Sequence, residues 1–160
     1  MKSADFGSIA ILVGAPPVIL PTPVTGWSDA DDALSIKRRE PSMTDKVGVM
    51  GDMAVFLGKN KSGLVTVKLF QTSPTNRVFQ RIVDLAEGGP GTFCPVQLTV
   101  MDTYRQDKFI GLFGYIPKPA DVMRGKEVKE QTWEIVVEKL GMLFGDPAFI
   151  GFATLAAEGQ

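Results

Sequence analysis

The chain has 160 residues, the size of one domain, and roughly two thirds of the unfolded surface can be buried at that size. Its 17 Lys and Arg residues against 18 Asp and Glu give a net charge of −1, so no general attraction to nucleic acid or to an anionic membrane is expected. The sequence contains no histidine, which removes the usual general base and the commonest zinc ligand, so we do not expect an enzyme.

Other chemistries also lack their residue patterns. Cys94 is the single cysteine, which excludes an intrachain disulfide and is typical of a small buried apolar residue. There is neither a calcium-binding loop nor a glycine-rich phosphate loop, so no metal, cofactor or catalytic residue is predicted. The longest apolar run, residues 9–20, is too short for a membrane span and contains Pro16 and Pro17, so no membrane insertion is expected.

The first part of the chain favours strands. Residues 5–14 and 18–20 predict an opening pair of strands around a proline turn. Residues 33–38 predict the next strand, because Leu34 and Ile36 alternate there with polar side chains.

Residues 40–60 combine many apolar side chains with glycines that interrupt any regular period. Surface loops are usually short and polar, so this long, Met-rich segment indicates an arm that is buried against something. We expect Met50, Met53 and Phe56 to contact another subunit. The alternative is a strand hairpin that closes the domain's own sheet.

Residues 61–76 carry the clearest local signals in the chain. A turn at Ser62-Gly63 releases a strand whose apolar side chains alternate from Val65 to Leu69. The run ends in a helix start, so turn, strand and helix follow one another closely.

One helix is predicted, over residues 74–87. Ser73 supplies its N-cap and Pro74 its first helical residue. A wide apolar stripe that includes Val78 and Ile82 lies opposite charged side chains, which is typical of a helix packed on a core.

Three further strands are predicted, over residues 96–100, 109–116 and 132–140. The middle strand is apolar on both faces, whereas the other two each present a polar face. The polar faces carry Gln97 and Thr99 on the first strand, and Glu134 and Glu138 on the last. The two glutamates are separated by roughly 13 Å along an extended strand, which is wide for a paired-carboxylate active site.

The predicted fold is mainly β with an α component: two packed antiparallel sheets in a sandwich or barrel-like domain with one flanking helix. We expect this β domain to span residues 1–144. Residues 145–160 form an apolar C-terminal extension, which is unusual for a chain end. Its residues Phe149 and Phe152 are expected to contact another subunit.

Several elements of this chain, in this order, resemble a known family. The elements are Lys61-Ser62-Gly63, Val65-Thr66-Val67, and Thr72-Ser73-Pro74 with Asn76. They are similar to elements of the tail tube proteins of contractile-tailed, myovirus-type bacteriophages, and the likeness extends over residues 6–140. The resemblance implies two packed antiparallel sheets flanked by a helix, and a structural virion protein without catalytic residues.

The same resemblance implies a mode of assembly. Six copies form a ring, the rings stack into a tube that guides DNA during ejection, and the arm contacts the neighbouring ring. The implied partners are the tail sheath protein, the tape measure protein, the baseplate initiator and passing double-stranded DNA, which is not bound specifically. Such a protein is assembled in the host cytoplasm and becomes part of the virion.

For a tube, the polar strand faces become candidates for the channel wall. These are the face with Gln97 and Thr99 and the face with Glu134 and Glu138. Two other functions stay open on the sequence alone: a type VI secretion-like tube subunit, and a monomeric ligand-binding β-barrel.

Overall fold

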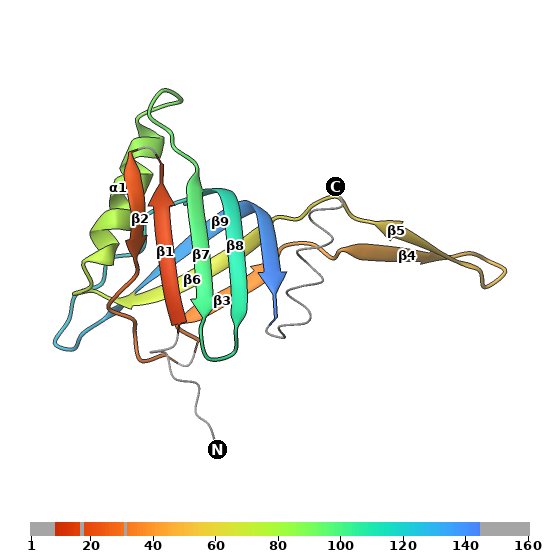
Figure 1. The fold of residues 1–160 in the computed structure, drawn as a ribbon, viewed down its shortest axis with the longest axis horizontal. Helices are drawn as coiled ribbons and strands as arrows, with labels where there is room; N and C mark the ends of the chain where they lie inside the picture. The colour runs from red at the N-terminus through yellow and green to blue at the C-terminus, as the bar shows by residue number, and fades with distance from the viewer. Residues whose placement is uncertain (1–8, 17, 31, 145–160) are drawn as a thin grey trace, which may run out of the picture.

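A computed structural model describes residues 9–16, 18–30 and 32–144 of the chain (Figure 1). Within these residues the chain forms nine antiparallel strands and one helix, so the expected mainly β, antiparallel architecture is confirmed. The strands are β1 (Ile9–Ala15), β2 (Ile19–Pro23), β3 (Leu34–Arg38), β4 (Met43–Val47), β5 (Met53–Leu57), β6 (Gly63–Phe70), β7 (Val96–Asp102), β8 (Asp107–Tyr115) and β9 (Glu130–Leu143). The helix, α1, spans Thr75–Glu87.

Seven strands form one continuous sheet in the order β2-β1-β7-β8-β9-β6-β3. The long strand β9 joins the two halves, because its first part, Glu130 to Val137, pairs with β6. Its second part, Val136 to Leu143, pairs with β8. In Figure 1, β1, β7 and β8 cross in front of β3 and β6, so the sheet is folded over into two layers. The layers expected from the sequence are therefore halves of one curved sheet.

The hydrophobic core fills the space between these layers. Alternate residues of β6, β7 and β9 point into it, as the period of two along a strand requires. These residues are Val65, Val67, Leu69, Val96, Leu98, Val100, Trp133, Ile135 and Val137. The core therefore fixes which face of each strand remains outside, and the outer faces are the surfaces available for assembly.

Gly63 has a role that differs from the predicted turn. It is the first residue of β6, it is buried, and it pairs with Val137. A Cβ atom at this position would lie 2.4 Å from Cδ2 of Leu140, closer than real Cβ contacts allow. Gly63 therefore permits the close approach of β6 and the Leu140 side chain.

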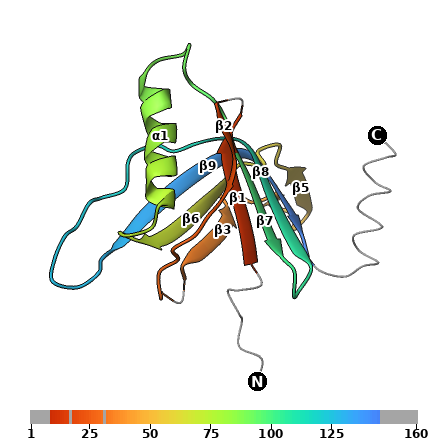
Figure 2. The same ribbon diagram turned by 60° about the vertical axis from the view of Figure 1, so that its left-hand side comes forward.

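The helix begins one residue later than predicted, at Thr75, with Pro74 at the N-cap position. Ser73, the predicted cap, is buried, and its hydroxyl donates a hydrogen bond to the backbone oxygen of Thr25. It also accepts a hydrogen bond from the Thr75 N–H. The apolar stripe is confirmed, because Phe79, Ile82 and Val83 are buried. Figure 2 shows that α1 covers the end of the folded sheet far from β5.

The arm of residues 40–60 contains a hairpin of two strands, β4 and β5, which pair only with each other in the described part of the chain. Every residue of both strands is exposed. Figure 1 shows this hairpin projecting from the body of the domain. The alternative of a hairpin that closes the domain's own sheet is wrong, because β3 and β6 already pair with each other across the root of the arm.

Candidate functional site

The hairpin presents two faces of different composition. Paired residues share a face, and the pairs Met43–Leu57, Asp45–Val55 and Val47–Met53 lie on the more apolar one. The opposite face carries the pairs Thr44–Phe56 and Lys46–Ala54. Met53 and Phe56, both predicted to contact another subunit, therefore point to opposite sides. A partner that covers both must enclose the hairpin or consist of two neighbouring chains.

The tip of the hairpin, residues 48–52, is a tight turn. Its backbone is held by hydrogen bonds from Gly48 N–H to the Asp52 oxygen, 2.7 Å, and from Gly51 N–H to the Gly48 oxygen, 2.9 Å. Gly51 has a φ of 87°, which glycine adopts without strain. Met50, the third predicted contact residue, is 89% exposed at this tip, and the neighbouring Val49 is also exposed. The tip is therefore a tight turn that exposes the apolar side chains of Val49 and Met50.

Where the hairpin leaves the body, its root is held by long-range hydrogen bonds. The Arg39 N–H donates to the Ser62 oxygen at 3.1 Å. The Arg38 guanidinium donates to the Leu140 oxygen at 2.9 Å. Lysines surround the root, and Lys59, Lys61 and Lys139 line a shallow hollow together with Glu138 and Asn60. Glu138 is thus surrounded by lysines and does not share its surroundings with Glu134.

Glu134 lies elsewhere on β9. It lines an open hollow of about 200 Å³ together with Lys118, Asp121, Glu130 and Thr132. Its strand neighbour on the outer face is Thr66, which in turn pairs with Ser35 of β3. This row of polar residues crosses three neighbouring strands of one layer.

Gln97 and Thr99 lie on the outer face of β7, in the other layer of the folded sheet. Thr99 is flanked there by Leu12 of β1 and Ile110 of β8. The structure therefore does not bring the four predicted channel residues together. Phe149 and Phe152, the remaining predicted contact residues, lie outside the described residues.

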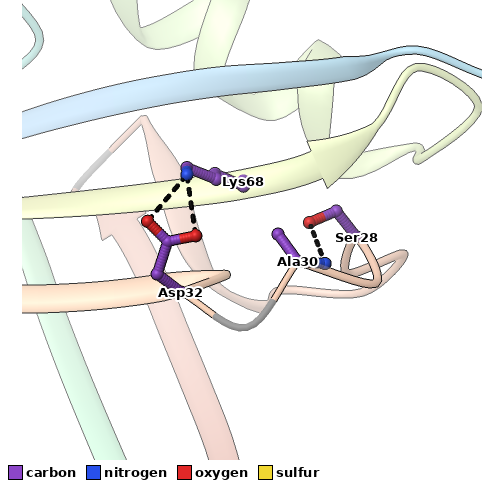
Figure 3. A network of polar contacts seen from close by, with 4 residues as sticks. All are labelled: Ser28, Ala30, Asp32 and Lys68. Carbon is purple, nitrogen blue, oxygen red and sulfur yellow. Dashed lines mark hydrogen bonds and ion pairs between the residues drawn. The ribbon is translucent and has the colours of Figure 1, made fainter.

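One ion pair supports the edge of the β3-β6-β9 layer (Figure 3). Both carboxylate oxygens of Asp32 accept hydrogen bonds from the Lys68 ammonium at 2.8 Å. The hydrogen bond first, and the attraction of the positive charge second, lower the pKa of Asp32 below its usual value. The nearby loop is ordered by a 3.3 Å hydrogen bond from the Ala30 N–H to the Ser28 hydroxyl.

Sequence reasoning missed two surface features. Phe113, within β8, has a φ of 54° and is 53% exposed, although non-glycine residues rarely adopt this conformation. The second feature is a groove of about 600 Å³ between the start of α1 and the connector that precedes β9. We call it the helix-end groove. It is lined by Gln71, Thr72, Ser73, Pro74, Asn76, Arg77, Gln80, Ala120, Val122, Arg124, Gln131 and Trp133. These residues come from distant parts of the sequence, which explains why no local pattern revealed them.

The described residues contain no group of three or more His, Cys, Asp or Glu side chains arranged to hold a metal ion. Across the same residues, no helix has the length and apolar character needed to cross a membrane.

The fold has counterparts among solved assemblies. The anti-feeding prophage tube terminating cap aligns with a TM-score of 0.57 at 9% identity, over 91% of this chain and 93% of that chain. The sheath/tube terminator of the PVC extracellular contractile injection system gives 0.54 at 10% identity, over 89% and 98% of the two chains. A chain of the native gene transfer agent particle gives 0.51 at 10% identity, over 90% and 100%. The fold is therefore shared with chains of contractile injection systems and of a gene transfer agent particle.

The amino-acid sequence identifies the family to which the chain belongs. Residues 21–145 match the family described as Bacteriophage PhiTE tail tube protein, and the chain belongs to that family. None of the curated proteins matches the sequence significantly. The resemblance to phage tail tube proteins is thus confirmed, and the protein is a structural component of the virion.

Proposed function

We propose that this protein is the major tail tube subunit of a contractile phage tail, that six copies form each ring, and that stacked rings form the channel for DNA ejection. Its role is structural rather than enzymatic. The observation that carries the proposal is the exposed hairpin on a domain of the tail tube family.

A hairpin of two strands has little stability of its own, and exposed apolar clusters mark interaction sites. The exposed apolar residues of the arm are Met43, Val47, Val49, Met50, Met53, Val55, Phe56 and Leu57. A cluster of this many exposed apolar side chains is unusual for a monomer in water. We therefore assign these residues to contacts between neighbouring subunits. The apolar extension, with Phe149 and Phe152, is assigned to the same kind of contact.

The proposed partners follow from this assignment. The protein binds copies of itself, the sheath protein surrounds the tube, and the tape measure protein and baseplate initiator meet it inside and at its end. The similarity in fold to a tube terminating cap supports a second candidate, a subunit that ends a tube rather than extends it. The two candidates differ in whether assembly continues beyond one ring.

The purified protein is expected to form rings and stacked tubes at high concentration, because burial of the hairpin on a neighbour removes apolar surface from water. Analytical ultracentrifugation followed by negative-stain imaging checks this result. Isolated rings that never stack would favour the terminating role. Monomers at every salt concentration, even with a tail initiator complex present, would contradict both candidates.

We further propose that the outer face of β3, β6 and β9 lines the channel, with Ser35, Thr66 and Glu134 in one row. DNA must slide past this wall, and each added cation that pairs with a phosphate increases its affinity for DNA. The alternative face around Gln97 and Thr99 is interrupted by apolar neighbours. The first face also carries Leu64 and Val136 in a neighbouring row, but its central row is polar across all three strands, and this row supports the assignment to the channel.

Replacement of Thr132 and Glu134 by Lys in assembled virions should slow DNA ejection, and the delay should shrink at high salt as the phosphate contacts are screened. Glu138 is left unchanged, because a lysine there would join Lys59, Lys61 and Lys139 at the root of the arm. The matched variant carries Lys at positions 97 and 99. A delay confined to that matched variant would place the channel wall on β7 instead.

A further inference from the structure

The helix-end groove contains a polar side chain, Gln131, that makes no side-chain hydrogen bond within the described residues. Gln131 is only 7% exposed, and its side-chain amide makes no hydrogen bond to any residue that the structure describes. Among the described residues only the Ser62 hydroxyl is a buried side-chain polar atom without a partner, so the Gln131 amide reaches the solvent that fills the groove. Because Gln131 lines the groove, a group that enters the groove can reach it.

The groove also carries positive charge and apolar surface. Arg77 and Arg124 both line it, and Arg124 donates a hydrogen bond to the Gln71 side chain at 3.1 Å. Pro74, Ala120 and Val122 contribute apolar atoms to the same lining. The complementary partner is therefore a short segment with both an apolar side chain and a carboxylate.

The start of α1 does not supply the binding groups itself. The Thr75 N–H is bonded to the Ser73 hydroxyl, the Asn76 N–H to the Ser73 oxygen, and the Arg77 N–H to the Pro74 oxygen. The Asn76 side chain is occupied as well, because it donates to the Phe70 oxygen and accepts from the Trp133 indole. Recognition in the groove thus depends on the two arginines and Gln131.

The tip of the hairpin combines exposed apolar side chains with a carboxylate, as the groove requires. Val49 and Met50 are exposed there, and the Asp52 carboxylate makes no hydrogen bond or ion pair with the described residues. The hairpin and α1 lie at opposite ends of the long axis of the domain (Figure 1), so a tip cannot reach the groove of its own chain. Two copies related head to tail would bring a tip to a groove, and contacts of this kind generate rings or filaments.

We propose that the helix-end groove is the socket for the hairpin tip of a second copy of this chain. Met50 packs against the apolar lining formed by Pro74 and Val122, and Asp52 pairs with Arg77 and Arg124. The inference rests on the proposed tube function and adds to it the surface that receives the arm.

Cross-linking tests the socket directly. In a Cys94→Ser background, Met50→Cys is combined with Val122→Cys, and assembled tubes are treated with a short bismaleimide. A ladder of covalently linked subunits is expected on a denaturing gel. Each single variant, and the control pair Met50→Cys with Glu87→Cys at the far end of α1, should give only monomers and isolated dimers.

A charge exchange provides a second measurement. Asp52→Arg and Arg77→Asp should each raise the protein concentration needed for assembly about tenfold, and the double variant should recover most of that loss. The socket is wrong, and the tube function stands, if the native chain forms tubes but tubes of the double-cysteine variant give no ladder. The same conclusion follows if the double charge variant does not recover assembly. If the native chain forms neither rings nor tubes, the tube function fails, and the socket fails with it.

Discussion

Met50→Asp and Phe56→Asp are each expected to abolish tube formation while the isolated subunit remains folded. Both side chains are exposed in the subunit, so the substitutions do not disturb its core. In the assembled tube each would replace an apolar side chain by a charged carboxylate that loses water on burial, and this should raise the concentration needed for assembly by about a hundredfold or more. Sedimentation measures the assembly, and circular dichroism with thermal unfolding checks the fold.

Conservative variants at the same positions separate charge from shape. Met50→Leu and Phe56→Leu should still assemble, because the contact remains apolar. Amide hydrogen exchange of residues 43–57 should be fast in free subunits and strongly slowed in native tubes. Equal exchange in both states, or full assembly of the aspartate variants, would show that the hairpin is not buried between subunits.

Trp133→Ala is expected to lower the free energy of unfolding by about 3–5 kcal/mol. Trp133 is 3% exposed and packs against Phe79 of α1, with 5.3 Å between the ring centroids. Its indole N–H donates to the Asn76 side-chain oxygen at 2.9 Å. Trp133 therefore holds β9 against α1 through both packing and a hydrogen bond. Its removal should destabilise the end of the domain that carries the helix-end groove.

Trp133→Phe isolates the hydrogen bond from the packing. This variant retains an aromatic ring but leaves the Asn76 oxygen without its donor, so a loss of about 1–3 kcal/mol is expected. Urea unfolding of the subunit measures both variants. A loss of equal size for the Phe and Ala variants would show that the hydrogen bond, rather than the apolar contact, fastens the helix.

Local patterns identified most of the elements because both regular periods are visible in the sequence. The alternation from Val65 to Leu69 gave β6, and the 3.6-residue stripe gave α1 to within one residue at its start. The strands β4 and β5 were less visible, because Gly48, Gly51 and Gly58 interrupt the pattern. An exposed hairpin also has no single buried face that could impose strict alternation.

The candidate surfaces could be predicted only in part. Met50 and Phe56 stood out because apolar residues in a long loop are unusual in themselves, and the structure shows both of them exposed. Glu134 and Glu138 have the spacing of one strand face, yet they lie in separate surroundings. The reason is that the segments next to each of them, the connector before β9 and the root of the arm, come from different parts of the chain.

The sequence by itself determined the strand and helix content, the apolar character of the arm and the absence of histidine chemistry, since each of these depends on neighbouring residues or on composition. The tertiary structure decided the rest. The curvature of the sheet depends on β9 pairing with β6 and then with β8, and the separation of the channel candidates follows from that curvature. The groove brings Arg77, Arg124 and Gln131 together through contacts between residues far apart in the chain, which no local period can encode.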